Sequence, residues 1–269
     1  MKSRALITGA SSGIGYAYAK YLSKEGWILD LISKNAERSI RSRETLDYPD
    51  ANFYLADLSK KSSIKEIVSN YETPDLIVAN AGIAINGSIG KLNELQKEDA
   101  YYLMCGGIID LIEGFAPKMI EKGTGRIVII SSIGAITAMP KSSIYSSAKA
   151  GIYMYGKSVS AELKNKGISV TVSLPGYVET EAHKKAGLDH LKSKVPSWMW
   201  ISADDVVNQT DSVIVNRSSY KNDLSNVRDA IKELGKYELR KYELDRQKKI
   251  LSKRNDQEAK KRLKKLMKF

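Results

Sequence analysis

The chain of 269 residues has little of several residue types that mark particular protein classes, with 1 Cys, 2 His and 6 Pro. Its single cysteine, Cys105, cannot form a disulfide within the chain or build a cysteine-based zinc site. Because His183 and His190 are the only histidines in the sequence, we expect no metal site. No stretch approaches the roughly 20 apolar residues that span a bilayer, and no secretory signal follows the N-terminal methionine. We therefore expect a protein of a reducing compartment, by default the cytoplasm.

Composition and charge separate the chain into two parts. The sequence is 42% hydrophobic and 28% charged, which excludes collagen-like and wholly disordered proteins. Its net charge of +12 is uneven, because residues 1–210 carry a net charge of +3 and residues 211–269 carry +9. We expect residues 1–215 to form one domain and residues 216–269 to form a basic, helical C-terminal extension.

Short apolar runs alternate with helical patterns along the first 175 residues. This alternation predicts an α/β fold, a doubly wound parallel sheet of the Rossmann-like kind. The predicted strands are 4–8, 27–33, 51–56, 75–80, 125–131 and 168–174. The predicted helices are 14–25, 59–70, 94–122 and 143–166, and a further helix is predicted to begin after Ser202 as N-cap.

The C-terminal extension allows three interpretations. Its charge favours a solvated surface segment. A short apolar stripe of Val227, Ile231, Leu234 and Tyr237 instead suits a helix that binds a partner or a second copy. The third interpretation is peripheral contact with an anionic membrane surface, whereas nucleic acid is not expected because acidic residues interrupt the positive charge.

A glycine-rich turn joins the first predicted strand to the first predicted helix. Glycine lets backbone N–H groups approach a pyrophosphate, and the helix N-terminus adds a partial positive charge. An ordinary turn between strand and helix is the alternative. The predicted cofactor-binding residues of this turn are Gly9, Ser11, Ser12, Gly13, Ile14 and Gly15.

The end of the second predicted strand indicates which dinucleotide binds. A carboxylate there binds the ribose 2′-hydroxyl of NAD, whereas a cation accommodates the 2′-phosphate of NADP. The sequence has Ser33 and Lys34 at this point and Arg38 one turn later, so we predict NADP(H) in preference to NAD(H). Asp30 is the alternative discriminator if the strand ends earlier.

A tyrosine and a lysine are placed to share one helical face. Tyr145 and Lys149 are four residues apart, and Ser132 follows the fifth predicted strand. A neighbouring ammonium is expected to lower the pKa of the tyrosine, so that the phenol exchanges a proton with an alcohol or carbonyl. Surface packing is the alternative for such a common pair.

Six motifs together resemble the classical short-chain dehydrogenase/reductase family over residues 3–210. They are Thr8-Gly9-Ala10-Ser11-Ser12-Gly13-Ile14-Gly15, Asp57-Leu58, Asn80-Ala81-Gly82, Ser132, Tyr145-Ser146-Ser147-Ala148-Lys149 and Pro175-Gly176-Tyr177-Val178-Glu179-Thr180. The resemblance implies that hydride passes between a nicotinamide and a ketone or secondary alcohol.

The resemblance also implies a role for each matched position. Tyr145 would be the general acid/base, Ser132 would bind the reacting oxygen, and Lys149 would lower the tyrosine pKa and hold the ribose. Asp57 would contact adenine, and Asn80 would support the central strand. Further cofactor contacts would come from Leu58, Ala81, Gly82, Pro175, Gly176, Val178 and Thr180.

The sequence departs from this family at two places. Thirteen residues before Pro117, the family usually has an asparagine that holds a water in the proton relay, and here Met104 stands instead. A reductase remains the leading function, but a cofactor-binding regulator or scaffold with weak catalysis is the alternative.

The family also has a seventh strand, for which residues 212–215 are the only apolar run. A displaced last strand would alter the contacts of the homo-oligomer that the family implies.

Residues 181–202 are expected to cover the substrate. Their apolar cluster of Trp198, Met199, Trp200 and Ile201 suggests a lid, while His183, Lys184 and Lys185 could meet an anionic group. This region resembles the branch of 3-ketoacyl reductases, which implies an acyl carbonyl substrate. Packing of the aromatic residues on the domain body is the alternative, and for each histidine a structural role is favoured.

Overall fold

A six-stranded parallel sheet is the centre of the computed structural model, which describes residues 2–181, 187 and 191–215. The strand order is β3-β2-β1-β4-β5-β6. The strands are β1 Arg4–Thr8, β2 Ile28–Ser33, β3 Ala51–Leu55, β4 Leu76–Ala79, β5 Gly125–Ile130 and β6 Ile168–Ser173. The order reverses between β1 and β4, and in such sheets ligands bind at this point, outside the carboxyl ends of the strands.

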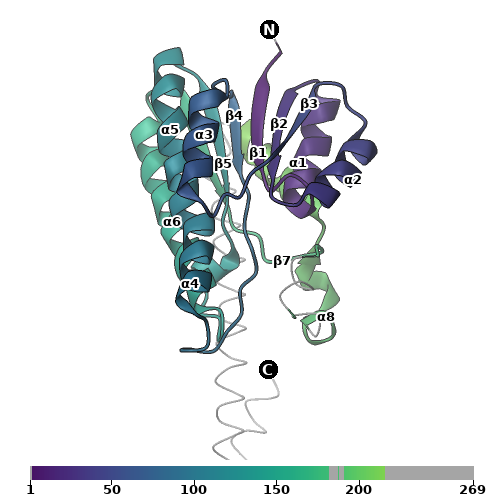
Figure 1. The fold of residues 1–269 in the computed structure, drawn as a ribbon, viewed down its shortest axis with the longest axis vertical. Helices are drawn as coiled ribbons and strands as arrows, with labels where there is room; N and C mark the ends of the chain where they lie inside the picture. The colour runs from purple at the N-terminus through teal and green to yellow at the C-terminus, as the bar shows by residue number, and fades with distance from the viewer. Residues whose placement is uncertain (1, 182–186, 188–190, 216–269) are drawn as a thin grey trace, which may run out of the picture. The chain divides into compact units, whose positions relative to one another are not determined.

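Helices cover both faces of the sheet (Figure 1). On one side lie α3 Lys61–Asn70, α4 Glu94–Tyr101, α5 Gly107–Lys122 and α6 Ser143–Leu163. On the other side lie α1 Gly13–Lys24 and α2 Ala36–Leu46, and α9 Ala203–Val215 packs into the same core as α1. The predicted doubly wound α/β fold is therefore confirmed for the described domain.

Each face of the sheet has its own core, and successive strand residues alternate between the two. Ile77 and Ile127 pack with α5 and α6, whereas Val78 and Val128 pack with α1 and α9. Because both faces are buried, the strands read as nearly continuous apolar runs rather than as alternating ones.

The long helix predicted over residues 94–122 is interrupted. A π-helical turn, η1 Tyr102–Gly106, separates α4 from α5. A Cβ on Gly106 would lie 2.9 Å from a ring carbon of Tyr102, and one on Gly107 would lie 3.1 Å from the Leu58 carbonyl oxygen. The two glycines thus let the widened turn pack tightly. Such turns are often found at functional sites.

Two further helices differ from the sequence expectation. Helix α2 was not predicted, because it buries Ser39 and Ser42 instead of an apolar stripe. The apolar run 212–215 is the last turn of α9 and not a strand. The predicted start of α9 is correct, since the Ser202 hydroxyl accepts a hydrogen bond from the Asp205 N–H at 3.0 Å.

A short strand before the predicted substrate segment, residues 181–202, pairs with another at the C-terminal end of that segment. Strand β7 Tyr177–Val178 pairs in parallel with β8 Trp200–Ile201, and the Tyr177 and Trp200 ring centroids are 5.2 Å apart. The remaining elements are η2 Ile133–Ala135, α8 Leu191–Lys194 and η3 Ser197–Met199. In the part of the chain that the structure describes, no helix is long and apolar enough to cross a membrane.

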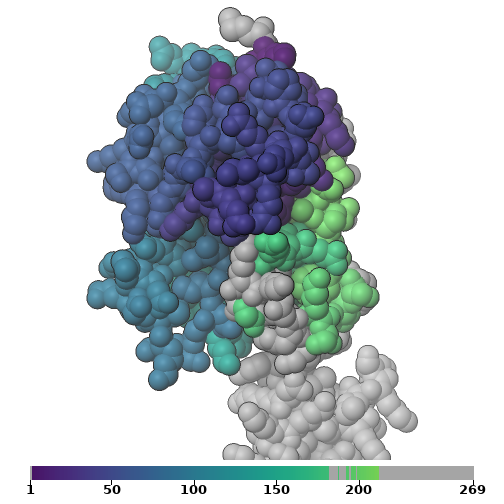
Figure 2. Space-filling view, turned by 45° about the vertical axis from the view of Figure 1, so that its right-hand side comes forward, coloured from purple at the N-terminus to yellow at the C-terminus, as the bar shows by residue number. Residues whose placement is uncertain are grey.

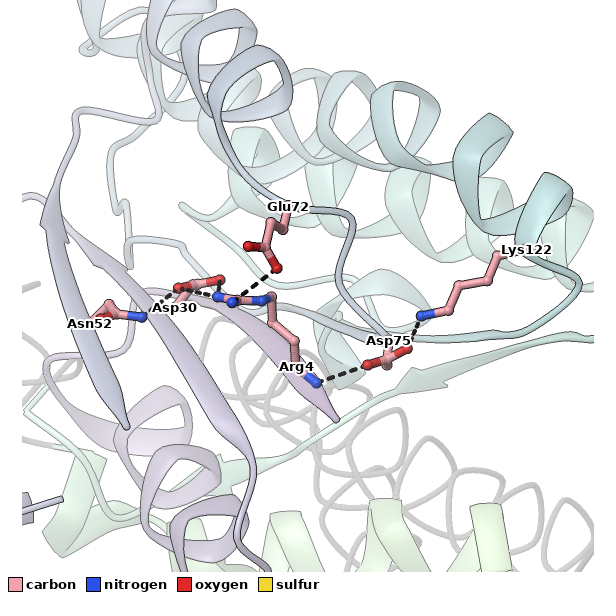
Figure 3. A network of polar contacts seen from close by, with 6 residues as sticks. All are labelled: Arg4, Asp30, Asn52, Glu72, Asp75 and Lys122. Carbon is pink, nitrogen blue, oxygen red and sulfur yellow. Dashed lines mark hydrogen bonds and ion pairs between the residues drawn. The ribbon is translucent and has the colours of Figure 1, made fainter. Parts of the chain in front are cut away.

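An ion-pair network ties together the strands near their N-terminal ends (Figure 3). The Arg4 guanidinium contacts Asp30 and Glu72, each at 3.0 Å, and Asn52 donates to Asp30 at 3.1 Å. The Arg4 N–H donates to Asp75, which also pairs with Lys122. The network therefore joins β1, β2, β3, the start of β4 and the end of α5.

The chain divides into two units, residues 1–215 and residues 216–269. The second unit lies outside the described residues, as do its predicted apolar stripe and the basic surface.

Candidate active site

The residues predicted to bind cofactor and substrate meet at the carboxyl edge of the sheet. Loops after β1, β3, β4, β5 and β6 carry Gly9, Asp57, Asn80, Ser132 and Pro175 in turn. A backbone hydrogen bond of 3.0 Å from the Ile133 N–H to the Pro175 carbonyl joins the last two loops. The parallel strands thus bring together residues that are far apart in the sequence.

The glycine turn has the geometry that a pyrophosphate needs. Gly9 and Gly13 have φ values of +67° and +56°, which favour glycine. A Cβ on Gly15 would lie only 2.4 Å from the Gly9 carbonyl oxygen, so no larger residue fits. The Ser12 side chain makes no capping bond at the start of α1. The turn therefore fits a bound phosphate, which helix N-termini favour.

Asn80 fastens the glycine turn to the end of β4. Its side-chain amide donates to the Thr8 carbonyl at 2.9 Å and to the Gly9 carbonyl at 3.3 Å. The Thr8 hydroxyl in turn accepts from the N–H groups of Asn80 and Ala81, at 2.9 and 3.0 Å. These bonds hold the turn in place before any ligand arrives.

Asp57 and Lys34 form an ion pair of 2.7 Å between the ends of β3 and β2. Partial burial alone would raise the pKa of Asp57, but hydrogen bonds from Lys34 and Ser59 keep it below its ordinary value. The carboxylate is therefore ionised and fixed in position. The neighbouring Leu58 is buried.

A hollow of about 170 Å³ lies between the glycine turn and α2. Ser11, Ser12, Arg38, Arg41 and Ser42 line it, together with Tyr16, Thr45 and Glu181. In Figure 2 the dark blue N-terminal elements and the green segment that follows β6 meet on one face of the molecule. Arg41, Ser42 and Thr45 were missed from the sequence because α2 itself was not predicted.

Ser33 and Asp30, which were also expected to discriminate between NADP(H) and NAD(H), do not line this hollow. The Ser33 hydroxyl is buried and hydrogen-bonded to Ser39. Asp30, the alternative discriminator, lies inside β2 with its side chain 3% exposed and paired with Arg4. Asp30 is thus held within the network of Figure 3, away from the carboxyl edge.

Ser132 and Tyr145 lie side by side around Gly134, where a Cβ would be 3.5 Å from the Ser132 Oγ. The Ser132 hydroxyl also accepts from the Gly134 N–H at 3.1 Å. A Cβ on Gly134 would lie 3.2 Å from the Tyr145 ring, so glycine leaves room for the phenol. Burial raises the pKa of Tyr145, and the nearby Ser132 hydroxyl only partly opposes this. The expected lowering of the tyrosine pKa is therefore wrong for the cofactor-free protein.

Lys149 is a buried amine. Its Nζ donates to the Ile130 carbonyl at 2.8 Å and lies 6.0 Å from the centre of the Tyr145 ring. Burial lowers the pKa of Lys149 to about 8, and the nearby Cys105 thiol opposes that shift. The amine can therefore hold or release a proton near neutral pH, as an acid–base group must.

Met104 is fully buried in the π-helical turn. Its Cγ and the Lys149 Nζ lie 3.6 and 3.7 Å from the position that a Cβ on Gly82 would take. A thioether thus stands close to the lysine where the family has an amide. Cys105 and Tyr101, which lie against Gly151 on the same helix as Lys149, were not predicted as site residues from the sequence.

The loop after β6 is described as far as Glu181, whereas the predicted substrate segment 181–202 is described only in part. Thr180 lies over the glycine turn, since a Cβ on Gly13 would be 3.1 Å from its methyl group. Val178 is buried, and Gly176 has open space around its Cα. His183, His190, Lys184 and Lys185 lie outside the described residues.

Comparison with known proteins agrees with this fold. Residues 3–190 match the short chain dehydrogenase family. The chain is 31% identical over 197 residues to 3-oxoacyl-(acyl-carrier-protein) reductase FabG of Chlamydia trachomatis, covering 71% of this chain and 79% of the relative. It is 32% identical over 187 residues to nodulation protein G of Azospirillum brasilense, covering 66% and 75%.

Solved structures show the same fold. A short-chain dehydrogenase from Sphingobium yanoikuyae in complex with NADPH superposes with a TM-score of 0.73 at 24% identity, covering 86% of this chain and 95% of that one. An actinorhodin polyketide ketoreductase with NADPH gives 0.69 at 26% identity, covering 79% and 90%. Fold and site define a nicotinamide-dependent oxidoreductase. The chain belongs to the short-chain dehydrogenase/reductase family.

Proposed function

We propose that this enzyme uses NADP(H) to interconvert a carbonyl compound and a secondary alcohol, with Tyr145, Lys149 and Ser132 as catalytic residues. The observation that carries the proposal is that Ser132 and Tyr145 lie together around Gly134, with the buried Lys149 6.0 Å from the tyrosine ring, at the carboxyl edge of the sheet. When bound, the nicotinamide supplies or accepts the hydride.

The protein's own part is to position the reactants and move a proton. Ser132 orients the reacting oxygen, and the phenol of Tyr145 gives it a proton during reduction. Because burial raises the pKa of Tyr145, the phenol is protonated at neutral pH, as a general acid must be. Lys149 holds its proton behind the tyrosine, at a group whose pKa is about 8.

The residues proposed to bind the cofactor lie on the loops that follow the carboxyl ends of the strands. The turn Gly9–Gly15 would hold the pyrophosphate, Asp57 would contact the adenine, and Asn80 would hold the turn. Val178 and Thr180 follow β6 on the nicotinamide side, and Thr180 packs against Gly13.

The choice of NADP(H) depends on the hollow beside α2. Arg38 and Arg41 bring two guanidinium groups to the hydroxyls of Ser11 and Ser12, although Arg41 also pairs with Glu37 and the Glu181 carboxylate lines the same hollow. Charge-assisted hydrogen bonds from the guanidinium groups suit a phosphate. The end of β2 itself carries Ser33 and Lys34 rather than a carboxylate, and Lys34 is paired with Asp57 from the end of β3. These groups favour the 2′-phosphate over the free 2′-hydroxyl.

An acyl carbonyl, such as a 3-oxoacyl thioester, is the proposed substrate class. The support is the 31% identity to a 3-oxoacyl-(acyl-carrier-protein) reductase over most of both chains. Apolar side chains also lie at the carboxyl edge, where the sulfur of Met139 would be 3.1 Å from a Cβ on Gly134, next to Tyr145.

Oxidation of NADPH against ketones, aldehydes and 3-oxoacyl thioesters tests this proposal. We expect turnover with the thioesters, lost in Tyr145→Phe and kept in Tyr153→Phe, which removes a hydroxyl from the same helix outside the site. Equal activity of the two variants would contradict the assignment of Tyr145.

A regulator that binds the cofactor with little turnover is the second candidate, and the buried Met104 favours it. Methionine cannot hold the water that the family's asparagine holds. Met104→Asn is expected to leave turnover unchanged or to raise it, while burying an amide costs about 1–3 kcal/mol of stability. Turnover and thermal unfolding of this variant are the measurements, and a large loss of turnover at equal folding would give Met104 a role of its own.

A further inference from the structure

The hollow beside α2 contains a carboxylate as well as two arginines. Glu181 lines it together with Arg38 and Arg41. Both arginines come from α2, whereas Glu181 comes from the segment after β6, which meets the N-terminal elements on the face shown in Figure 2. The hollow measures only about 170 Å³, so charges that line it lie within or close to the Debye length of about 8 Å at physiological salt. A phosphate bound there would therefore be repelled by the Glu181 carboxylate.

The chain immediately before Glu181 is fixed to the body of the domain. The Glu179 N–H donates to the Ile201 carbonyl at 2.9 Å. The Thr180 methyl group lies against the glycine turn, 3.1 Å from the position that a Cβ on Gly13 would take. These contacts hold the backbone beside the glycine turn, and this is why a residue so far from α2 in the sequence lines the same hollow.

Positive and negative charges balance around the hollow. Arg41 pairs with Glu37 of the same helix at 2.8 Å. Arg38 and Glu181 bring one further charge of each sign. The two guanidinium groups are thus matched by two carboxylates, whereas the arginines alone would give the hollow an excess of positive charge. A phosphate that enters has to compete with carboxylates for the guanidinium groups.

We propose that Glu181 is a specificity-determining residue, which weakens the binding of a phosphate in this hollow and so limits the preference for NADP(H) over NAD(H). This inference rests on the proposed function, in which the hollow takes the ribose 2′-phosphate. The carboxylate opposes a dinucleotide that carries this phosphate. It has little effect on one that ends in a hydroxyl, because a hydroxyl brings no charge to the hollow.

Binding of adenosine 2′,5′-bisphosphate and of 5′-AMP to the full-length protein tests the inference without any turnover. Only the first probe carries the 2′-phosphate. In calorimetric titration, we expect Glu181→Gln to bind the bisphosphate about five-fold more tightly than the wild type does, and to bind 5′-AMP equally. Glu44→Gln removes a carboxylate of α2 that does not line the hollow, so this matched control should change neither affinity.

Ionic strength and the intact dinucleotides extend the same test. The gain in Glu181→Gln should shrink at 1 M salt, where the Debye length is about 3 Å, and a gain that persists there overturns the inference. NADPH and NADH should differ as the two probes do. An unchanged or weaker affinity of Glu181→Gln for the bisphosphate overturns the inference, and so does an equal gain for 5′-AMP.

Alanine at both Arg38 and Arg41 separates failure of this inference from failure of the proposed function. If that variant binds the bisphosphate more weakly while Glu181→Gln changes nothing, the NADP(H) site stands and the inference about Glu181 is wrong. If the arginine variant binds the bisphosphate as the wild type does, the hollow does not take the 2′-phosphate, and both are refuted.

Discussion

At the scale of the residue, the site depends on the cost of burying one amine. Lys149 is 4% exposed and donates to a backbone carbonyl, so its charge is only partly compensated. This burial destabilises the folded state. It also gives the site an amine whose pKa is about 8, close to a tyrosine whose pKa lies above its ordinary value.

This burial predicts how stability depends on pH. Between pH 8 and the ordinary lysine value of 10.5, the unfolded chain keeps the Lys149 proton while the folded protein has released it. Folding is therefore opposed by the buried charge below pH 8, and this penalty disappears as the pH rises through that window. We expect Lys149→Met to be more stable than the wild type at pH 7, with a difference that shrinks toward pH 10.

Denaturant unfolding of both proteins at several pH values measures this difference. A difference that stays constant or grows toward pH 10 would mean that Lys149 is not a buried charge in the folded protein.

The residues of the site could be predicted from sequence, but their protonation could not. The glycine turn, Asp57, Asn80, Ser132, Tyr145 and Lys149 lie together at one edge of the sheet, as strand ends in a parallel sheet must. Their motifs are local, so a sequence displays them. The pKa of Tyr145 depends on its burial in the folded protein, and spacing alone gave the wrong direction.

At the scale of the element, α2 and the π-helical turn contribute most that the sequence did not indicate. Helix α2 presents serine to the body of the protein, and its apolar residue Ile40 is 60% exposed. Periodicity of apolar residues therefore could not find it. Gly107 in the interruption of the 94–122 helix packs against the Leu58 carbonyl, a group almost 50 residues away that no local pattern contains.

The arginine face of α2 predicts a specific effect on cofactor binding. Replacing Arg38 and Arg41 with alanine is expected to weaken NADPH binding ten-fold or more, since each charge-assisted hydrogen bond contributes about 1.5–3 kcal/mol. NADH affinity should change little. Arg43→Ala, on the same helix but outside the hollow, is the matched control.

Fluorescence titration with both dinucleotides gives the affinities. Equal weakening of NADPH and NADH, or tighter NADH binding by the wild type, would contradict the assignment of the hollow to the 2′-phosphate.

At the scale of the molecule, the N-terminal ends of the strands carry a stabilising network and the carboxyl ends carry the candidate active site. The network of Arg4, Asp30, Asn52, Glu72, Asp75 and Lys122 joins the strands near their N-terminal ends (Figure 3). The carboxyl ends carry the glycine turn and the tyrosine–lysine pair. Each edge can therefore be changed by mutation with little effect on the other. The predicted homo-oligomer and cytoplasmic location remain predictions.

Loss of the network should lower stability without changing the site. Arg4→Leu leaves the Asp30 carboxylate buried with Asn52 as its remaining partner, and breaking such a pair costs about 3 kcal/mol. Lys2→Ala, which removes an exposed pair with Asp50, is the control and should cost less than about 1 kcal/mol. Equal stability of the two variants in denaturant unfolding would contradict this role of Arg4.

The central claim is that this fold places Tyr145 to move a proton in a nicotinamide-dependent reduction. The most direct measurement is the rate of NADPH oxidation by Tyr145→Phe together with its NADPH affinity in the same preparation. The account predicts that turnover falls about 10²–10⁴-fold while the affinity stays within two-fold of the wild type. Wild-type turnover in Tyr145→Phe would contradict it, because the proton would then come from another group.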